Sequence, residues 1–262
     1  MCCAAFGGAA HALLSSPGRG ARRAIFVPIY SSLHGLQRRR GVMSGYALRL
    51  FEDILTAAES ATLPPRRRVV YVVEGRVLVS ADGQTGAFSA NSAWFGAGPC
   101  TVRADAEKAR LWRWELVRTP ISDDGAACGP GVMSRLLLMS NIELDPTGQY
   151  LMRCDRVDFP PGGIAYTHTH AGPGIRCLLL GRIEIRVEDE TFSRQPGEPW
   201  FERGTDPVLA LTSSDEPTSF VRAMILPRSL LGQSSIRYVK AENLDKPKLQ
   251  VYTRFADEFI EL

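Results

Sequence analysis

The feature that most constrains the fold of this chain is an internal repeat. Two segments match at a constant offset of 106 residues, because residues 72–79 read VVEGRVLV and residues 178–185 read LLLGRIEI. A Trp-Phe pair follows nineteen residues after the glycine in each copy, at 94–95 and at 200–201. Equal spacing without an insertion indicates the same strand lengths and turns in both copies. We therefore predict a duplicated domain.

The residue pattern inside each copy predicts β structure. Apolar and polar side chains alternate along residues 182–187, as they do in a strand with one buried face. Turn residues recur every 8–12 residues or so, and no long helical pattern intervenes, which favours a closed antiparallel barrel or a sandwich. The predicted fold class is all-β, with two tandem domains that are each a barrel or a sandwich.

The chain outside the repeat differs in composition. Residues 1–42 contain six Arg and no Lys, Asp or Glu, which is typical of a mitochondrial transit peptide but also of an upstream extension that does not fold. We prefer the second interpretation and exclude His11 and His34, which lie there, as ligands. The predicted organisation is 1–42 as a disordered leader or artefactual extension, 43–118 as the N-terminal barrel, 119–133 as a linker, 134–227 as the C-terminal barrel, and 228–262 as a tail that packs on a barrel or on a partner subunit.

Charge and hydropathy narrow the function classes. Without its leader the chain has 25 basic and 28 acidic residues and no basic stripe, so we expect no nucleic-acid partner. No apolar run reaches the roughly 18 residues of a membrane span, so we expect no membrane partner. The six cysteines form no C-x-x-C pair and do not resemble a disulfide framework, which favours a reducing, cytoplasmic location.

The most informative stretch is residues 160–170, which read PPGGIAYTHTH. Side chains two residues apart on a strand point to the same side, so His168 and His170 can bind one ion. Imidazole suits Fe, Mn, Ni, Cu and Zn alike. The sequence therefore predicts a divalent transition-metal site (Fe, Mn, Ni or Zn), and its further protein ligands are oxygen or sulfur, because residues 43–262 contain no third histidine.

This stretch resembles the first motif of the cupin superfamily, G-x5-H-x-H-x3/4-E-x6-G. The glycines are Gly162 and Gly181 and the histidines are His168 and His170. The resemblance extends from about residue 45 to residue 227 and implies a bicupin, which consists of two tandem cupin barrels (double-stranded β-helix or jelly-roll). Two positions depart from the family pattern. Gly174 stands where the motif glutamate would be, and the second motif lacks its histidine in the segment 203–207.

Glu202 is the predicted substitute for the missing ligands. Strand alternation places it on the same face as Trp200, so it completes a set of two histidines and one carboxylate if that face is the barrel interior. The alternative is a rim carboxylate in water. Asp206 is a weaker candidate for the same role.

Two further residues are predicted to take part in catalysis. Arg176 lies two residues after Gly174, where an inward-pointing guanidinium would bind a substrate carboxylate or phosphate. A structural ion pair with Glu184 is the alternative. Tyr166 lies two residues before His168 and could supply an acidic proton in the same pocket, or it could pack as a rim tyrosine.

The N-terminal copy has no matching ligands. Thr62, Pro64 and Gly96 occupy the positions of the two histidines and Glu202. We expect a degenerate, structural barrel, and we expect its arginine run at residues 66–68 to be a solvated loop.

The predicted function is a metal-dependent bicupin enzyme that acts on a small, anionic organic metabolite by dioxygenase-like or by lyase or isomerase chemistry. The alternative is a non-catalytic bicupin that binds or senses a small molecule. We expect a homodimer, because the apolar tail segment 249–255 needs a surface to pack on.

Overall fold

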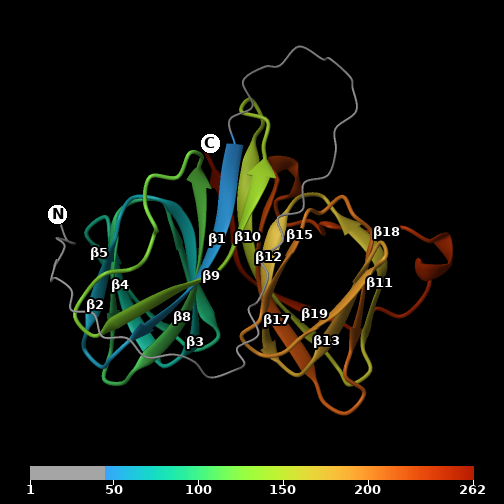
Figure 1. Cartoon of the computed structure of the whole chain (residues 1–262), viewed down its shortest axis with the longest axis horizontal. Coiled ribbons are helices and arrows are strands. Elements are labelled where there is room, and N and C mark those ends of the chain that lie inside the picture. Colours follow the sequence, from blue (N-terminus) through green and yellow to red (C-terminus); the bar gives the residue numbers. More distant parts are fainter. Residues whose placement is uncertain (1–44) are drawn as a thin grey trace, which may run out of the picture. The chain divides into compact units, whose positions relative to one another are not determined.

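The computed structural model describes residues 45–262, which form two β barrels in tandem (Figure 1). The predicted all-β fold class is confirmed, because the helices in this range are two short 3-10 turns. No helix there is long and apolar enough to cross a membrane. The four cysteines of this range are free thiols. The predicted leader, with His11 and His34, lies outside the described residues.

The N-terminal barrel contains strands β1 to β9, arranged as two facing sheets. One sheet has five strands and the other has four. In spatial order, the first sheet is β6 (Ser92–Gly96), β3 (Arg67–Glu74), β8 (Ala109–Arg118), β1 (Gly45–Leu55) and β9 (Val132–Glu143), and the second sheet is β2 (Ser60–Leu63), β7 (Cys100–Ala104), β4 (Arg76–Ala81) and β5 (Gln84–Ser89).

The C-terminal barrel contains strands β10 to β19 and has two sheets of five strands each. One sheet is β15 (Pro199–Glu202), β12 (Gly174–Leu180), β17 (Thr218–Pro227), β10 (Tyr150–Phe159) and β19 (Val251–Ile260), and the other is β14 (Glu190–Arg194), β13 (Ile183–Val187), β16 (Val208–Thr212), β11 (Ile164–His170) and β18 (Ile236–Tyr238). The short turns are η1 (Arg228–Leu230) and η2 (Ala241–Asn243).

The repeat corresponds to equivalent positions in the two barrels. Gly75 and Gly181 both have a positive φ, +82° and +76°, and a Cβ on either one would collide with a backbone carbonyl. Glycine is therefore required at both turns. The Trp-Phe pairs also match, since Trp200 packs in the core of its own barrel, as Trp94 does in the N-terminal barrel, whereas Phe95 and Phe201 pack in the core between the barrels.

The two barrels share a core because their five-stranded sheets pack on each other. Strand β8 is buried on both faces, although its inner face also carries the ion pair of Arg113 with Glu115. Trp112, Trp114 and Leu116 enter the shared core, and Leu111 packs inside the N-terminal barrel. The indole Nε1 of Trp114 donates a hydrogen bond of 3.1 Å to the carbonyl of Ile175 in the other barrel.

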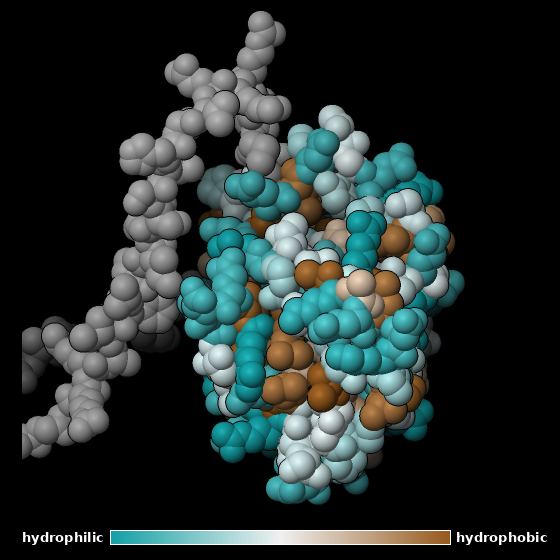
Figure 2. Space-filling model, turned by 90° about the vertical axis from the view of Figure 1, so that its right-hand side faces the viewer, coloured by the Kyte–Doolittle hydropathy of each residue, from teal (hydrophilic) through white to brown (hydrophobic). Residues whose placement is uncertain are grey.

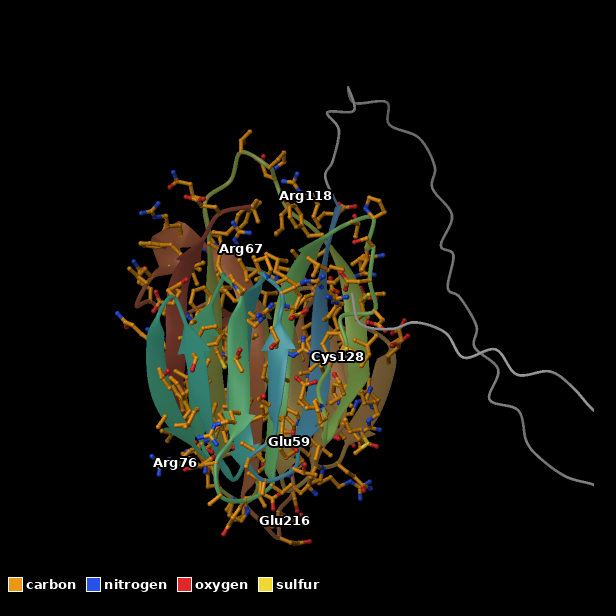
Figure 3. The ribbon with its side chains drawn as sticks, turned by 90° about the vertical axis from the view of Figure 1, so that its left-hand side faces the viewer. Glu59, Arg67, Arg76, Arg118, Cys128 and Glu216 are labelled. Carbon is orange, nitrogen blue, oxygen red and sulfur yellow. The ribbon has the colours of Figure 1, made fainter. Side chains whose placement is uncertain are left out.

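The boundary between the barrels differs from the prediction. Residues 132–143 form β9, which pairs along its length with β1, so the predicted boundary at residue 134 lies inside the N-terminal barrel. The segment 119–131 covers that barrel, because Thr62 forms a bridge with Cys128 (labelled in Figure 3) and Arg113 donates to the carbonyl of Gly125. The connection between the barrels is the segment 144–149.

The arginine run of the N-terminal barrel also differs from the prediction of a solvated loop. Arg68 is fully buried and lies 3.2 Å from the carboxylate of Glu115. Glu115 also pairs with Arg113 at 2.6 Å and with Arg49 at 2.9 Å. A buried carboxylate with these partners needs no metal ion to neutralise it, which supports a structural role for this barrel.

The C-terminal tail completes its own barrel. Strand β18 pairs with β11, and β19 pairs with β10 in the way that β9 pairs with β1. The C-terminal barrel therefore extends beyond the predicted limit of residue 227 to residue 260. The tail was also the reason to expect a homodimer, and a strand that pairs within its own chain no longer supplies that reason.

The hydrogen bond between the barrels can be tested by substitution. We expect Trp114→Phe to lower the free energy of unfolding by about 1–3 kcal/mol, because it removes a buried donor and leaves a cavity. Trp112→Phe is the matched control, since its equally buried Nε1 has no partner among the described residues. Urea unfolding of both variants measures the difference, and an equal loss in both would contradict a role for the hydrogen bond.

Candidate metal centre

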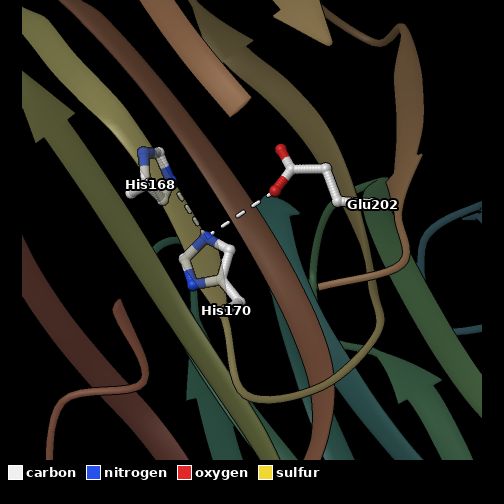
Figure 4. Close-up of side chains that lie close together, drawn as sticks. All are labelled: His168, His170 and Glu202. Carbon is white, nitrogen blue, oxygen red and sulfur yellow. Dashed lines mark hydrogen bonds and ion pairs between the residues drawn. The ribbon is translucent and has the colours of Figure 1, made fainter. Parts of the chain in front are cut away.

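The candidate site lies inside the C-terminal barrel, where β11 and β15 face each other (Figure 4). His168 and His170 are 5% and 6% exposed, and the side chain of Glu202 is 8% exposed. One ligand atom from each residue lies within 4.8 Å of the other two. The structure therefore brings together the three residues that the sequence predicts as metal ligands.

The two imidazole rings converge through their Nε2 atoms. His168 Nε2 lies 3.2 Å from His170 Nε2, and His170 Nε2 lies 3.6 Å from Oε2 of Glu202 (Figure 4). Two nitrogens bound to one tetrahedral ion at about 2.0–2.1 Å are about 3.3 Å apart. The spacing of the two imidazoles therefore suits a shared ion.

A backbone carbonyl selects the tautomer of His168. Its Nδ1 lies 2.7 Å from the carbonyl oxygen of Tyr166, which can only accept a hydrogen bond. The proton therefore resides on Nδ1, and the lone pair of Nε2 is directed at His170. Such a contact is the usual way in which proteins orient a metal-binding histidine. On the other ring, Nδ1 of His170 lies 3.4 Å from the hydroxyl of Ser235.

Both histidines are electrically neutral at physiological pH. Burial lowers the pKa of His168, although the carboxylate of Glu202 acts in the opposite direction. Burial lowers the pKa of His170 well below its ordinary value, and the charges of Arg222 and Arg176 add to this effect. A neutral imidazole is the form that binds a metal ion.

Arg176 holds Glu202 in the barrel interior. The guanidinium is fully buried, and its Nη2 lies 2.7 Å from Oε2 of Glu202. Burial lowers the pKa of Arg176 to about 10, while Glu202 acts against that decrease, so the guanidinium is charged at neutral pH. The indole Nε1 of Trp200 donates a hydrogen bond of 2.8 Å to Oε1 of Glu202. The alternative of a structural ion pair is met by Glu202 and not by Glu184, which pairs with Arg186.

The site fits one metal ion by its donors and by its size. Oε2 of Glu202 is buried and accepts no well-aligned hydrogen bond among the described residues, so it keeps a lone pair for an ion. The cavity between the three side chains has a volume of about 20 Å³. That volume admits an ion or one water molecule.

The structure corrects the predicted position of Tyr166. The pairing of β11 with β16 changes register between Ala165 and His168, so the simple alternation of sides is interrupted there. Ala165 lines the cavity with the histidines, and Tyr166 does not. Its ring lies 5.0 Å from Nζ of Lys246 instead. Tyr166 contributes its carbonyl group to the site, and its phenol is not in position to donate a proton there.

Asp206 is not part of the cluster. Its side chain is 27% exposed and lies 3.9 Å from Arg203, outside the cavity. Of the two predicted carboxylates, the structure brings Glu202 to the histidines. The reason is the alternation along β15, which places Glu202 beside the buried Trp200.

Residues that the sequence did not indicate complete the walls of the cavity. Arg222 on β17, Ile236 on β18 and Tyr252 on β19 line it. Arg222 binds Asp155 through two hydrogen bonds of 2.6 and 3.2 Å. Arg222 lies two residues after Phe220, which packs in the core of this barrel, so strand alternation could have indicated an inward Arg222, whereas no local pattern predicts that the tail closes the barrel.

A much larger pocket, of about 700 Å³, lies apart from this cluster. Its walls include Phe201 and Ile225, which belong to the side of the sheet that faces the N-terminal barrel. Glu202 points to the opposite side of the same sheet, into the barrel. The larger pocket is therefore separated from the candidate metal centre by the sheet itself.

Comparison with known proteins supports the fold. A structure of Bacillus subtilis oxalate decarboxylase, described by its Mn(II) centres, matches with a TM-score of 0.56 and 11% identity over 79% of this chain and 78% of that one. The formate complex of Lactobacillus farciminis oxalate decarboxylase matches with a TM-score of 0.55 and 12% identity over 79% and 88%. AerE from Microcystis aeruginosa matches with 0.50 and 12% over 71% and 90%.

The likeness to these structures shows the fold, which is the cupin fold that the sequence motif implied. No family model matches the sequence, and no curated protein matches it either. Identities this low establish the fold alone, so the function has to be argued from the site.

The pairing of Glu202 with Arg176 can be tested through stability. We expect Glu202→Gln to lower the free energy of unfolding by about 3–5 kcal/mol, because it leaves a buried guanidinium without its counter-charge. The double variant Glu202→Gln/Arg176→Met removes both charges and is expected to recover most of that loss. Guanidinium chloride unfolding measures both variants, and a double variant no more stable than Glu202→Gln would show that the pair does not determine the stability of this site.

Proposed function

We propose that this chain is a metal-dependent enzyme of the bicupin class that acts on a small, anionic organic molecule. The observation that carries the proposal is the pair of Nε2 atoms 3.2 Å apart inside the barrel, with the carboxylate of Glu202 beside them. Two facing lone pairs repel each other unless a proton or a cation lies between them. Burial disfavours the charged imidazolium form of both rings, and a His170 that carries its proton on Nδ1, toward the hydroxyl of Ser235, presents the second lone pair to a cation.

The residues around the candidate metal centre have separate roles in this proposal. His168, His170 and Glu202 would hold the ion, and the carbonyl of Tyr166 and the hydroxyl of Ser235 would orient the two rings. A metal ion bound there supplies Lewis acidity and open positions for substrate, water or dioxygen. Arg176 keeps Glu202 in place and is the nearest buried cation for a negatively charged substrate group.

The likeness of fold to known enzymes reduces the number of candidate metals and reactions. Two histidines and one carboxylate suit Fe, Mn, Ni or Zn. The Mn(II) centres named for the Bacillus subtilis oxalate decarboxylase support testing manganese first. A decarboxylase of the same fold supports lyase chemistry on a small carboxylic acid ahead of dioxygenase-like or isomerase chemistry, and this ranking rests on analogy.

A binding or sensing role is the second candidate, and the two departures from the metal-binding motif, at Gly174 and in the segment 203–207, favour it. The cavity of about 20 Å³ at the histidines admits an ion but no metabolite beside it. A substrate therefore needs the walls to move. Side chains on the tail that closes the barrel are largely exposed, such as Val239 at 51% and Leu244 at 60%, and Figure 2 shows hydrophobic patches on the face over β11 and β18. The segment 239–250, between β18 and β19, forms no strand pair, which suits a movable wall, whereas β18 and β19 are held by pairing with β11 and β10.

Metal content is the direct test of the proposal. We expect the full-length chain to bind close to one equivalent of a transition metal, and His168→Ala to lose it, because two ligands do not retain an ion as three do. Thr169→Ala is the matched control, since Thr169 lies between the histidines and points to the other side of β11. Element-resolved mass spectrometry measures the content, and metal retained after His168→Ala would remove the proposal.

The second candidate makes a different prediction. A protein that binds a metabolite without using a metal would be stabilised by that metabolite after chelation as much as before it. We expect the opposite for a metal-dependent enzyme, whose own melting temperature falls after treatment with EDTA, because the bound ion stabilises the folded chain. Stabilisation that is unchanged by EDTA would favour the binding module.

A further inference from the structure

A second pocket adjoins the metal centre on the side of the tail. It has a volume of about 140 Å³ and is lined by side chains of β10, β17, β19 and residues 234–236. We call it the tail pocket. It shares Arg222, Ile236 and Tyr252 with the small cavity at the histidines, so these three side chains separate the two spaces.

Arg222 presents an unused donor at this boundary. Its side chain is 6% exposed, and its Nε and Nη2 bind the carboxylate of Asp155. Among residues 45–262 its Nη1 has no hydrogen-bond partner. Burial opposes the charge of Arg222, but the pairing with Asp155 raises its pKa above the ordinary value, so the group stays charged. A buried guanidinium with a spare N–H is a strong donor to an oxyanion.

Arg254 supplies a second guanidinium to the tail pocket. Its side chain is 39% exposed and makes one ion pair, in which Nη1 lies 3.3 Å from Asp257. Arg153 also lines the pocket, but each of its three nitrogens already donates, to Asp257 or to the carbonyls of Leu230 and Gln233. Arg153 therefore fixes the tail, while Arg222 and Arg254 have donors to spare.

The remaining polar groups also favour a negatively charged ligand. Ser234 and Ser235 line the tail pocket with their hydroxyls, and Ser235 also contacts His170. The carboxylate of Asp155 lines it too, but both of its oxygens are bound by Arg222. Three guanidinium groups thus face two carboxylates, Asp155 and Asp257, and the surplus charge is positive.

The charges form one row across the sheet. Arg176 pairs in register with Arg222, Arg222 with Asp155, and Asp155 with Arg254, so the row crosses β12, β17, β10 and β19. One end of this row is Arg176, which binds Glu202 at the metal centre, and the other end is Arg254 in the tail pocket. A ligand held at Arg222 and Arg254 lies next to the metal centre.

We propose that the tail pocket binds a small oxyanion, either a carboxylate or a phosphate, through Arg222, Arg254 and the hydroxyls of Ser234 and Ser235. A cavity of about 150 Å³ binds a molecule the size of benzene, so the ligand has about six non-hydrogen atoms. The binding of the oxyanion does not depend on the proposed function. Access of a substrate through this pocket to the metal centre does rest on the proposed function.

The test is calorimetric titration of the full-length chain with malonate and, separately, with inorganic phosphate. We expect saturable binding of at least one of them and a loss of affinity of about tenfold or more in Arg254→Gln, because a charged donor is removed. Arg222→Lys is expected to weaken binding as well, since it keeps the charge but loses the fork. Arg254→Gln changes an exposed side chain, so it tests the pocket even if Arg222→Lys fails to fold.

Arg237→Gln is the matched control, because it removes the same charge as Arg254→Gln. Arg237 is exposed on β18 and does not line the tail pocket. We expect its affinity to equal that of the unchanged protein. Binding of malonate alone assigns the pocket to carboxylates, and binding of phosphate alone assigns it to phosphates. Absence of binding for both anions, or an equal loss in Arg254→Gln and Arg237→Gln, would overturn the proposal.

The same titration of His168→Ala separates this inference from the proposed function. Arg222 and Arg254 do not depend on His168, so we expect that variant to bind the oxyanion with unchanged affinity after it has lost its metal. A protein that binds metal and no oxyanion would refute the tail pocket and leave the metal centre intact. A protein that binds the oxyanion and no metal would refute the metal centre and leave the tail pocket intact.

Discussion

The need to neutralise a buried guanidinium determines the arrangement of the C-terminal barrel. Arg176 is fully buried in the sheet that faces the metal centre, and a charge in that position is tolerated only with a partner. Its partner is Glu202, 2.7 Å away. That pairing holds the carboxylate inside the barrel, within 3.6 Å of His170. The ion pair is thus the reason that a carboxylate is available to the two histidines at a place where the usual motif glutamate is replaced by glycine.

The N-terminal barrel supports this site without resembling it chemically. It buries one face of the sheet that carries Arg176, Glu202 and Arg222, and Trp114 joins the two barrels through the carbonyl of Ile175. A sheet packed on both faces moves little, so the donors on its inner face keep their positions. Gly96 shows the contrast, because the ring of Trp94 lies where the side chain matching Glu202 would be.

The sequence was sufficient to predict features that follow from the repeat or from strand alternation. It did not predict features that depend on pairing between segments far apart in the chain. The alternation along β15 made Glu202 a candidate ligand beside Trp200, but it left open whether that face is the barrel interior or the rim. The register change in β11 moved Tyr166 out of the cavity, and two residues of local pattern cannot indicate such an irregularity. The sequence predicted that the tail packs on a barrel or on a partner subunit, but it did not predict which strands the tail pairs with, since residues 236–238 and 251–260 pair with strands about 70 to 110 positions earlier in the chain.

The two barrels treat an equivalent arginine in opposite ways. Arg113 and Arg222 are each the fifth residue of their strands, and each binds an aspartate of the neighbouring strand at 2.6 Å. In the N-terminal barrel the segment 119–131 folds over this place, and the carbonyl of Gly125 accepts from Arg113 at 3.1 Å. In the C-terminal barrel no described segment supplies that acceptor to Arg222. In the N-terminal barrel the chain itself satisfies the guanidinium of Arg113, whereas the guanidinium of Arg222 faces a cavity. Arg222 therefore has a donor available for a ligand.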